Sequence, residues 1–177
     1  IWGVKVSDML YCGDVAKILS SLKDDYKLGI MVDVKLHDIP SSMENSIGKL
    51  VGGGANIVTI HCSSNYRPKN TGLLKYIATD LEIKWIYDKS YEEIVRAFSD
   101  MALMNNYEYI MGSVKEMKYI QDNPLKKICT GIRPSWYQER HDQVRIATVK
   151  EAVRSEAEFI VIGRPITTAA NVKEVIE

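Results

Sequence analysis

The chain has 177 residues, a length that suits one domain with a sizeable hydrophobic core. Its 23 Lys and Arg residues balance 23 Asp and Glu residues, so nothing in the net charge favours nucleic acid or an anionic membrane as a partner. No apolar run approaches the ~20 residues of a membrane span, and three widely spaced cysteines without a CxxC pair predict reduced thiols in a cytoplasmic protein.

Seven short apolar runs in the sequence have the length of a buried β-strand. In chain order they cover residues 1–7, 28–36, 55–63, 82–87, 107–113, 126–132 and 158–165. Most of them are apolar along their whole length rather than at alternate positions. This pattern is typical of strands that are covered on both faces, as in a parallel sheet.

Amphipathic stretches lie between several of these runs. Apolar residues recur at helical spacing in 14–25, 90–105 and 147–157, and Thr148 with Glu151 forms a candidate capping box. Strands and helices therefore alternate along the chain, at intervals of roughly 20 to 30 residues. The alternation predicts a parallel sheet or a (β/α) barrel.

Charged and polar residues follow the predicted strands where each strand ends, which is where active sites lie in parallel α/β folds. Lys5 is near the end of the first run, and Asp33, Lys35 and Asp38 are at and just beyond the end of the second. Asp33 and Lys35 are two apart, so their side chains point the same way. A purely structural ion network is the alternative, but buried ionic groups gain little stability. We therefore favour a proton donor held in a fixed electrostatic field.

Two arginines follow the last two predicted strands. Arg164 comes after Gly163, where the backbone can approach a ligand closely, and Arg133 follows the preceding strand. An arginine can grip a phosphate with a fork of donors, and barrels often bind phosphate after strands 7 and 8. The pair therefore predicts a phosphate site.

Four motifs together resemble the orotidine 5′-monophosphate decarboxylase family. "DVKLHDIP" (33–40) is similar to the family's Asp-x-Lys-x-x-Asp signature, and "TGIRP" (130–134), "DQVRIAT" (142–148) and "VIGRPIT" (161–167) resemble its C-terminal third in order and spacing. The resemblance implies an α/β fold of the (β/α)8 TIM-barrel class, as a single domain over 1–177. It also implies that strands 2 to 8 are present and that the first strand, with its ribose-binding aspartate, is missing from this chain.

The resemblance implies a role for each matching residue. Lys35 would protonate C6 of the pyrimidine as carbon dioxide leaves, beside Asp33 and Lys5, and Asp38 would reach into the site of a neighbouring subunit in a homodimer. The substrate-binding residues that it implies are Ser42, Ser90, Pro134, Arg133, Gln143, Gly163 and Arg164. No cofactor and no metal would be required for this cytoplasmic enzyme of pyrimidine biosynthesis.

Two other functions remain open at the level of the sequence. A sugar-phosphate decarboxylase of the same superfamily would use the same Asp-Lys-Asp array with a magnesium ion. A non-catalytic nucleotide-binding homologue would keep the phosphate site without turnover. Both bind a phosphorylated small molecule, so only the reaction and its metal requirement separate the three functions.

Overall fold

A computed structural model describes residues 1–7, 13–64, 66–68, 74–78, 89–137 and 145–176. Its seven strands form one sheet in the order in which they occur along the chain, and every neighbouring pair is parallel. The strands are β1 (Gly3–Val6), β2 (Gly29–Leu36), β3 (Ile57–His61), β4 (Leu74–Ala78), β5 (Tyr109–Ser113), β6 (Lys126–Thr130) and β7 (Ala157–Ile160). The predicted parallel sheet is thereby confirmed.

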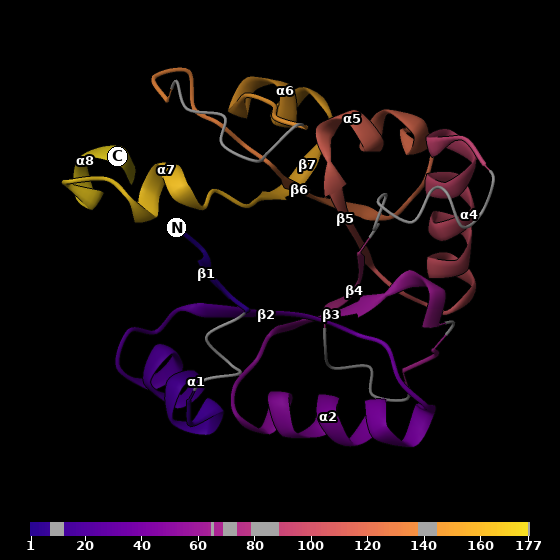
Figure 1. The fold of residues 1–177 in the computed structure, drawn as a ribbon, viewed down its shortest axis with the longest axis horizontal. Helices are drawn as coiled ribbons and strands as arrows, with labels where there is room; N and C mark the ends of the chain where they lie inside the picture. Colours follow the sequence, from indigo (N-terminus) through magenta and orange to yellow (C-terminus); the bar gives the residue numbers. More distant parts are fainter. Residues whose placement is uncertain (8–12, 65, 69–73, 79–88, 138–144, 177) are drawn as a thin grey trace.

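The helices that precede β7 lie outside the curve that the sheet makes, and the last two helices follow β7 (Figure 1). They are α1 (Val15–Asp24), α2 (Pro40–Gly52), α4 (Tyr91–Met104), α5 (Val114–Met117), α6 (Val149–Arg154), α7 (Arg164–Thr167) and α8 (Val172–Ile176), with short 3₁₀ turns η2 (Cys62–Ser64) and η4 (Lys118–Ile120). None of the helices within the described residues is both long and apolar enough to cross a membrane.

Six of the seven predicted strands coincide with strands of the structure. The structure forms β4 from Leu74–Ala78, whereas the predicted run at 82–87 lies outside the described residues. β7 ends at Ile160 rather than near Arg164, because Arg164 begins α7. The ends of the strands still bring the predicted site residues of β1, β2, β6 and β7 to one rim of the sheet.

Local capping chemistry explains where the predicted helices begin. Asp14 accepts a hydrogen bond from the backbone of Lys17 at 3.2 Å, which caps α1. The hydroxyl of Thr148 accepts from the backbone of Glu151 at 3.2 Å, and the Glu151 carboxylate accepts in return from the Thr148 backbone at 2.7 Å. The predicted capping box of α6 is therefore confirmed.

Two hydrophobic clusters lie on the two faces of the sheet. The larger cluster packs helix residues such as Leu19, Ile47 and Val95 against outward-facing strand residues such as Ile30. The smaller cluster contains only strand residues, which are Met31, Ile57, Tyr109, Met111 and Ile128, with Phe159 and Val161 packed against it. Because successive strand residues face opposite ways, this second cluster fills the inside of the curved sheet. The inward-facing residues that follow it along the strands line the candidate site.

Candidate active site

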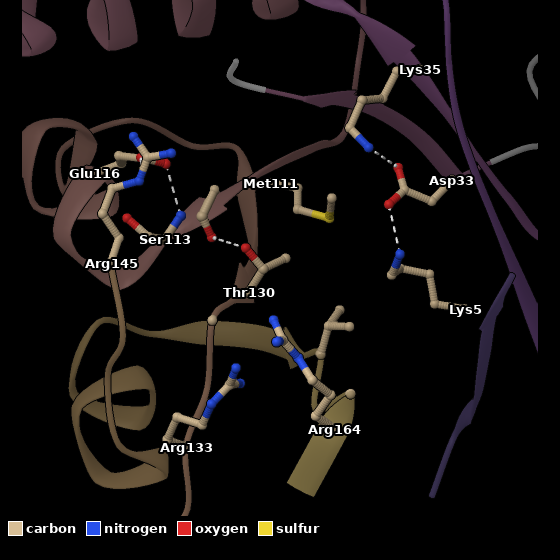
Figure 2. A pocket seen from close by; sticks show the side chains of 14 residues that line it. Lys5, Asp33, Lys35, Met111, Ser113, Glu116, Thr130, Arg133, Arg145 and Arg164 are labelled. Carbon is tan, nitrogen blue, oxygen red and sulfur yellow. Dashed lines mark hydrogen bonds and ion pairs between the residues drawn. The ribbon is translucent and has the colours of Figure 1, made fainter. Parts of the chain in front are cut away.

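Lys5, Asp33 and Lys35 form an alternating array of charges at the ends of β1 and β2 (Figure 2). The Nζ of Lys5 donates to Oδ2 of Asp33 at 2.7 Å, and the Nζ of Lys35 donates to Oδ1 of Asp33 at 3.0 Å. The Asp33 side chain is 5% exposed, whereas those of Lys5 and Lys35 are 29% and 45% exposed. Each oxygen of the buried carboxylate therefore faces an ammonium group that also reaches solvent.

Thr59 on β3 makes hydrogen bonds with both the Asp33 carboxylate and the Lys35 backbone. Its hydroxyl donates to Oδ1 of Asp33 at 3.0 Å and accepts from the backbone N–H of Lys35 at 2.7 Å. The register between β2 and β3 shifts between Val32 and Leu36, and Lys35 has a φ of +47°. A non-glycine residue in this left-handed region carries about 1–2 kcal/mol of strain. The backbone is thus held in an unfavourable conformation at the residue that bears the exposed ammonium group.

The surroundings of Asp33 act on its pKa in opposite directions. Burial raises the pKa of the carboxyl group, whereas the hydrogen bond and charge of Lys5, together with those of Lys35, lower it. The lysines prevail, so the pKa of Asp33 lies below its ordinary value. Asp33 is therefore a carboxylate at neutral pH, and the array carries two positive charges around one negative charge.

The array forms one wall of a pocket of about 350 Å³ at the carboxyl ends of the strands. This volume lies within the range of small-molecule sites. The lining consists of Lys5, Asp33, Lys35, Met111, Gly112, Ser113, Glu116, Thr130, Gly131, Arg133, Arg145, Val161, Gly163 and Arg164. The pocket thus brings residues from five strand ends together, as the sequence predicted for β1, β2, β6 and β7.

Arg133 and Arg164 supply positive charge to the same pocket from β6 and β7. Arg133 is only 7% exposed, and its backbone N–H donates to the carbonyl of Ala147 at 2.8 Å. Its Nη1 donates to the carbonyl of Ile132 at 3.1 Å, while its buried Nε has no partner among the described residues. Gly163 borders open space, since an added Cβ would meet no atom within 4 Å. This side of the pocket can accept an anion.

A third group of lining residues was not identified from the sequence. Ser113 ends β5, and its backbone N–H donates to Oε2 of Glu116 at 2.7 Å. The other oxygen of Glu116, Oε1, pairs with Nε of Arg145 at 3.4 Å. The Ser-x-x-Glu pattern at the end of a predicted strand was the available signal, because it is typical of a helix N-terminus just beyond a strand end.

Other predicted residues lie outside the described lining of this pocket. Asp38 is exposed, and its Oδ1 accepts from the backbone of Ile39 at 2.6 Å. Ser42 lies in the first turn of α2, and Pro134 is half-buried beyond β6. Ser90 caps α4, where its hydroxyl accepts from the Glu93 backbone at 3.2 Å and donates to the Glu93 carboxylate at 2.7 Å. Their predicted substrate contacts stay predictions.

Gln143, which the sequence assigned to the phosphate site, lies outside the described residues. The nearest described residue on that segment of the lining is Arg145. An isolated parallel bridge pairs Ala147 with Ile132, just beyond the end of β6. The role of Gln143 therefore stays a prediction from the sequence.

Comparisons with known proteins agree with this geometry. The family model described as "Orotidine 5'-phosphate decarboxylase / HUMPS family" matches residues 78–177. Orotidine 5′-phosphate decarboxylase of Campylobacter jejuni subsp. doylei is 31% identical, over 100% of this chain and 86% of the relative, and that of Campylobacter concisus is 28% identical over the same shares.

A solved structure shows the same architecture. The crystal structure of orotidine 5′-phosphate decarboxylase from Lactobacillus acidophilus superposes with a TM-score of 0.78 at 22% identity, covering 97% of this chain and 82% of that one. The predicted (β/α)-barrel class is confirmed by this likeness. The resemblance inferred from the four sequence motifs is confirmed by the family model and the relatives.

Proposed function

The chain belongs to the orotidine 5′-phosphate decarboxylase / HUMPS family, and on this premise we propose that it is a carboxy-lyase that converts orotidine 5′-monophosphate to uridine 5′-monophosphate. The reaction is a step of pyrimidine biosynthesis. One observation carries the proposal: the array of Lys5, Asp33 and Lys35 shares a single pocket with Arg133 and Arg164.

The array suits a decarboxylation that proceeds without a cofactor. The bond between C6 and the carboxyl carbon breaks, carbon dioxide leaves, and its bonding electrons stay on C6. The ammonium group of Lys35 stabilises the developing negative charge, then gives C6 a proton and later regains one from solvent. Asp33 and Lys5 hold that ammonium group in place, because their mutual contacts fix both oxygens of the carboxylate.

The two arginines suit the 5′-phosphate of the same substrate. Both line the pocket, and the buried Nε of Arg133 is a donor without a partner in the described part of the chain. Gly163 leaves space beside Arg164 for the backbone to approach the anion. Binding energy gained at the phosphate can then be used to hold the pyrimidine against Lys35.

We further propose that the active unit is a homodimer in which Asp38 completes the neighbouring subunit's site. Asp38 is exposed and does not line the pocket of its own chain, although it lies only three residues beyond Lys35. Its carboxylate is fixed at the start of α2 by the backbone N–H of Ile39. An exposed carboxylate beside an exposed Ile39 suits a contact between two copies.

The direct test follows the absorbance of orotidine 5′-monophosphate on mixing with the protein, with and without a chelator. We expect loss of absorbance in both samples. A second assay uses a sugar phosphate as the substrate. If that substrate is turned over, and turnover stops with the chelator and returns with magnesium, the sugar-phosphate decarboxylase is favoured instead. Tight calorimetric binding of uridine 5′-monophosphate without turnover would favour the non-catalytic homologue and overturn the proposed reaction.

A further inference from the structure

The hydroxyl of Ser63 joins two histidines just beyond the pocket. His37 directly follows β2, His61 ends β3, and Ser63 lies in the turn η2. The Oγ of Ser63 is 3.1 Å from Nε2 of His37 and 2.8 Å from Nδ1 of His61. The two rings meet edge to face, with centroids 5.4 Å apart. In the part of the chain that the structure describes, none of the three lines the pocket, so the proposed reaction leaves this cluster unexplained.

The backbone N–H of Ser63 fixes the direction of these hydrogen bonds. It donates to Nδ1 of His61 at 3.3 Å, so that nitrogen carries no proton. The Ser63 hydroxyl therefore donates its single hydrogen to the same nitrogen, and its oxygen accepts from the Nε2–H of His37. The hydrogen bonds run from His37 through Ser63 to His61, and they tie the segment that follows β2 to the end of β3.

β3 and its turn thus hold the segment 33–40 at two separate points. Thr59 holds the first half, since it bonds to the Asp33 carboxylate and to the Lys35 backbone. Ser63 holds the second half through His37. The helix α2 begins directly afterwards, at Pro40, without a side-chain cap among the described residues. The contact between His37 and Ser63 therefore replaces the local cap that would otherwise fix this turn.

We propose that His37 is a positioning residue that holds Asp38 in place for the neighbouring subunit's site. This inference rests on the proposed homodimer. Asp38 accepts a hydrogen bond from the adjacent backbone of Ile39, but this local bond moves with the segment and cannot hold it. His37 connects the segment to β3, one residue before Asp38. Because Thr59 already holds Lys35 independently, loss of His37 should displace Asp38 rather than Lys35.

The first test removes the hydrogen bonds one at a time. His37→Ala should lower turnover of orotidine 5′-monophosphate roughly tenfold, because a displaced group loses its orientation. His37 is exposed, so this variant leaves no cavity and should fold. His37→Gln should keep most of the activity, since its amide can still donate to Ser63. Ser63→Ala should behave like His37→Ala. Ser64→Ala is the matched control and should stay unchanged, because that neighbouring hydroxyl bonds to the backbone of Tyr66 instead.

Subunit exchange then shows in which site the lesion acts. If His37 acts through Asp38, His37→Ala damages the neighbouring site, and a hybrid dimer with Lys35→Ala keeps one intact site. An equal mixture should recover roughly one quarter of wild-type activity, against about one twentieth if His37 acts on Lys35 of its own chain. Mixing His37→Ala with Asp38→Asn should also give only about one twentieth, because each hybrid site then carries one lesion.

Three results would each overturn the inference: wild-type turnover in His37→Ala, a His37→Gln variant no better than His37→Ala, or no recovery with Lys35→Ala. A separate mixture of Lys35→Ala and Asp38→Asn tests the shared site alone. If that mixture recovers activity while the His37 mixture does not, the inference fails and the proposed dimer stands. If neither recovers, the shared site fails with the inference, and turnover by the wild type still supports the proposed reaction.

Discussion

Asp33 is the residue on which the charges of the pocket depend. Its carboxylate accepts hydrogen bonds from Lys5, Lys35 and Thr59, and so joins three neighbouring strands. A buried carboxylate with these partners is costly to leave unpaired. The array therefore requires Asp33 to stay ionised, which makes it sensitive to acid.

The lowered pKa of Asp33 predicts how stability depends on pH. Because the pKa is lower in the folded than in the unfolded state, the unfolded chain takes up the proton first. The stabilisation is complete above the unfolded value of about 4 and is lost as the pH falls through the folded value. Urea unfolding between about pH 3 and 7 should therefore show a steeper acid loss in the wild type than in Asp33→Asn.

Asp122→Asn is the matched control, because it also removes one carboxylate but at a side chain that is 83% exposed. An equal acid loss in the wild type and in Asp33→Asn would contradict the assigned effect of the two lysines. The comparison uses unfolding alone, so it does not depend on the proposed reaction.

Arg164→Ala should act on the phosphorylated substrate only. One charge-assisted contact with a phosphate is worth about 1.5–3 kcal/mol, so kcat/KM for orotidine 5′-monophosphate should fall roughly 10- to 150-fold. The effect should nearly vanish for orotidine, which lacks the phosphate. Arg154→Ala, at an exposed residue of α6 outside the pocket lining, is the control. An equal loss for both substrates would remove Arg164 from the phosphate site.

At the level of the strand, Lys35 has both a reactive ammonium group and a left-handed backbone conformation. The first should affect turnover and the second should affect stability, so two variants can separate them. We expect Lys35→Ala and Lys35→Gly each to lose more than ~100-fold in turnover, while uridine 5′-monophosphate still binds. The two variants should differ in stability, because alanine keeps the strain at φ +47° and glycine relieves it. Lys35→Gly should be about 1 kcal/mol more stable than Lys35→Ala in urea unfolding.

Lys27 provides the control for this pair of variants. It also has a positive φ, of 54°, but it is exposed between α1 and β2, away from the pocket. Lys27→Gly should exceed Lys27→Ala in stability by a similar margin, with turnover unchanged in both. Turnover within tenfold of wild type in either Lys35 variant would refute the role of Lys35 as proton donor.

The same strand shows what a single sequence can and cannot predict. The apolar run and the two-residue spacing predicted that Asp33 and Lys35 face the same way, and the structure places both on the pocket. The sequence carried no sign of the register shift or of the hydrogen bond that Thr59 accepts from the Lys35 backbone, because these depend on the register of β3 against β2. Periodicity predicts which face a residue takes, whereas register is set by the packing of the whole sheet.

The remaining differences have similar causes. β4 forms at Leu74–Ala78, and the strand predicted at 82–87 lies outside the described residues. Ser90, which the resemblance assigns to the pyrimidine, caps α4 in the structure, and its substrate contact stays a prediction. Ser113 and Glu116 are three residues apart, but Arg145 lies 29 residues beyond Glu116, so the contact between Glu116 and Arg145 could not be predicted from sequence spacing.

At the scale of the whole molecule, the two faces of the sheet are packed with hydrophobic side chains, and the pocket lies at the rim formed by the strand ends. The helices and the larger hydrophobic cluster cover the outside, and the smaller cluster fills the inside below the pocket. Asp38 belongs to neither part, since it is exposed beyond the end of β2. A carboxylate in the family's signature that is exposed and does not line its own chain's pocket suits a site shared between two subunits.

Subunit exchange between two variants tests that shared site. If Asp38 serves the neighbouring site, a hybrid dimer of Lys35→Ala and Asp38→Asn collects both lesions in one site and none in the other. Random exchange of equal amounts makes about half of the dimers hybrids, so activity should return to roughly one quarter of wild type if the two sites of a closed dimer act independently. If Asp38 serves its own chain, every hybrid site carries one lesion and the mixture stays inactive. Continued inactivity after exchange has been demonstrated by labelled subunits would therefore refute the shared site and leave the role of Lys35 untouched.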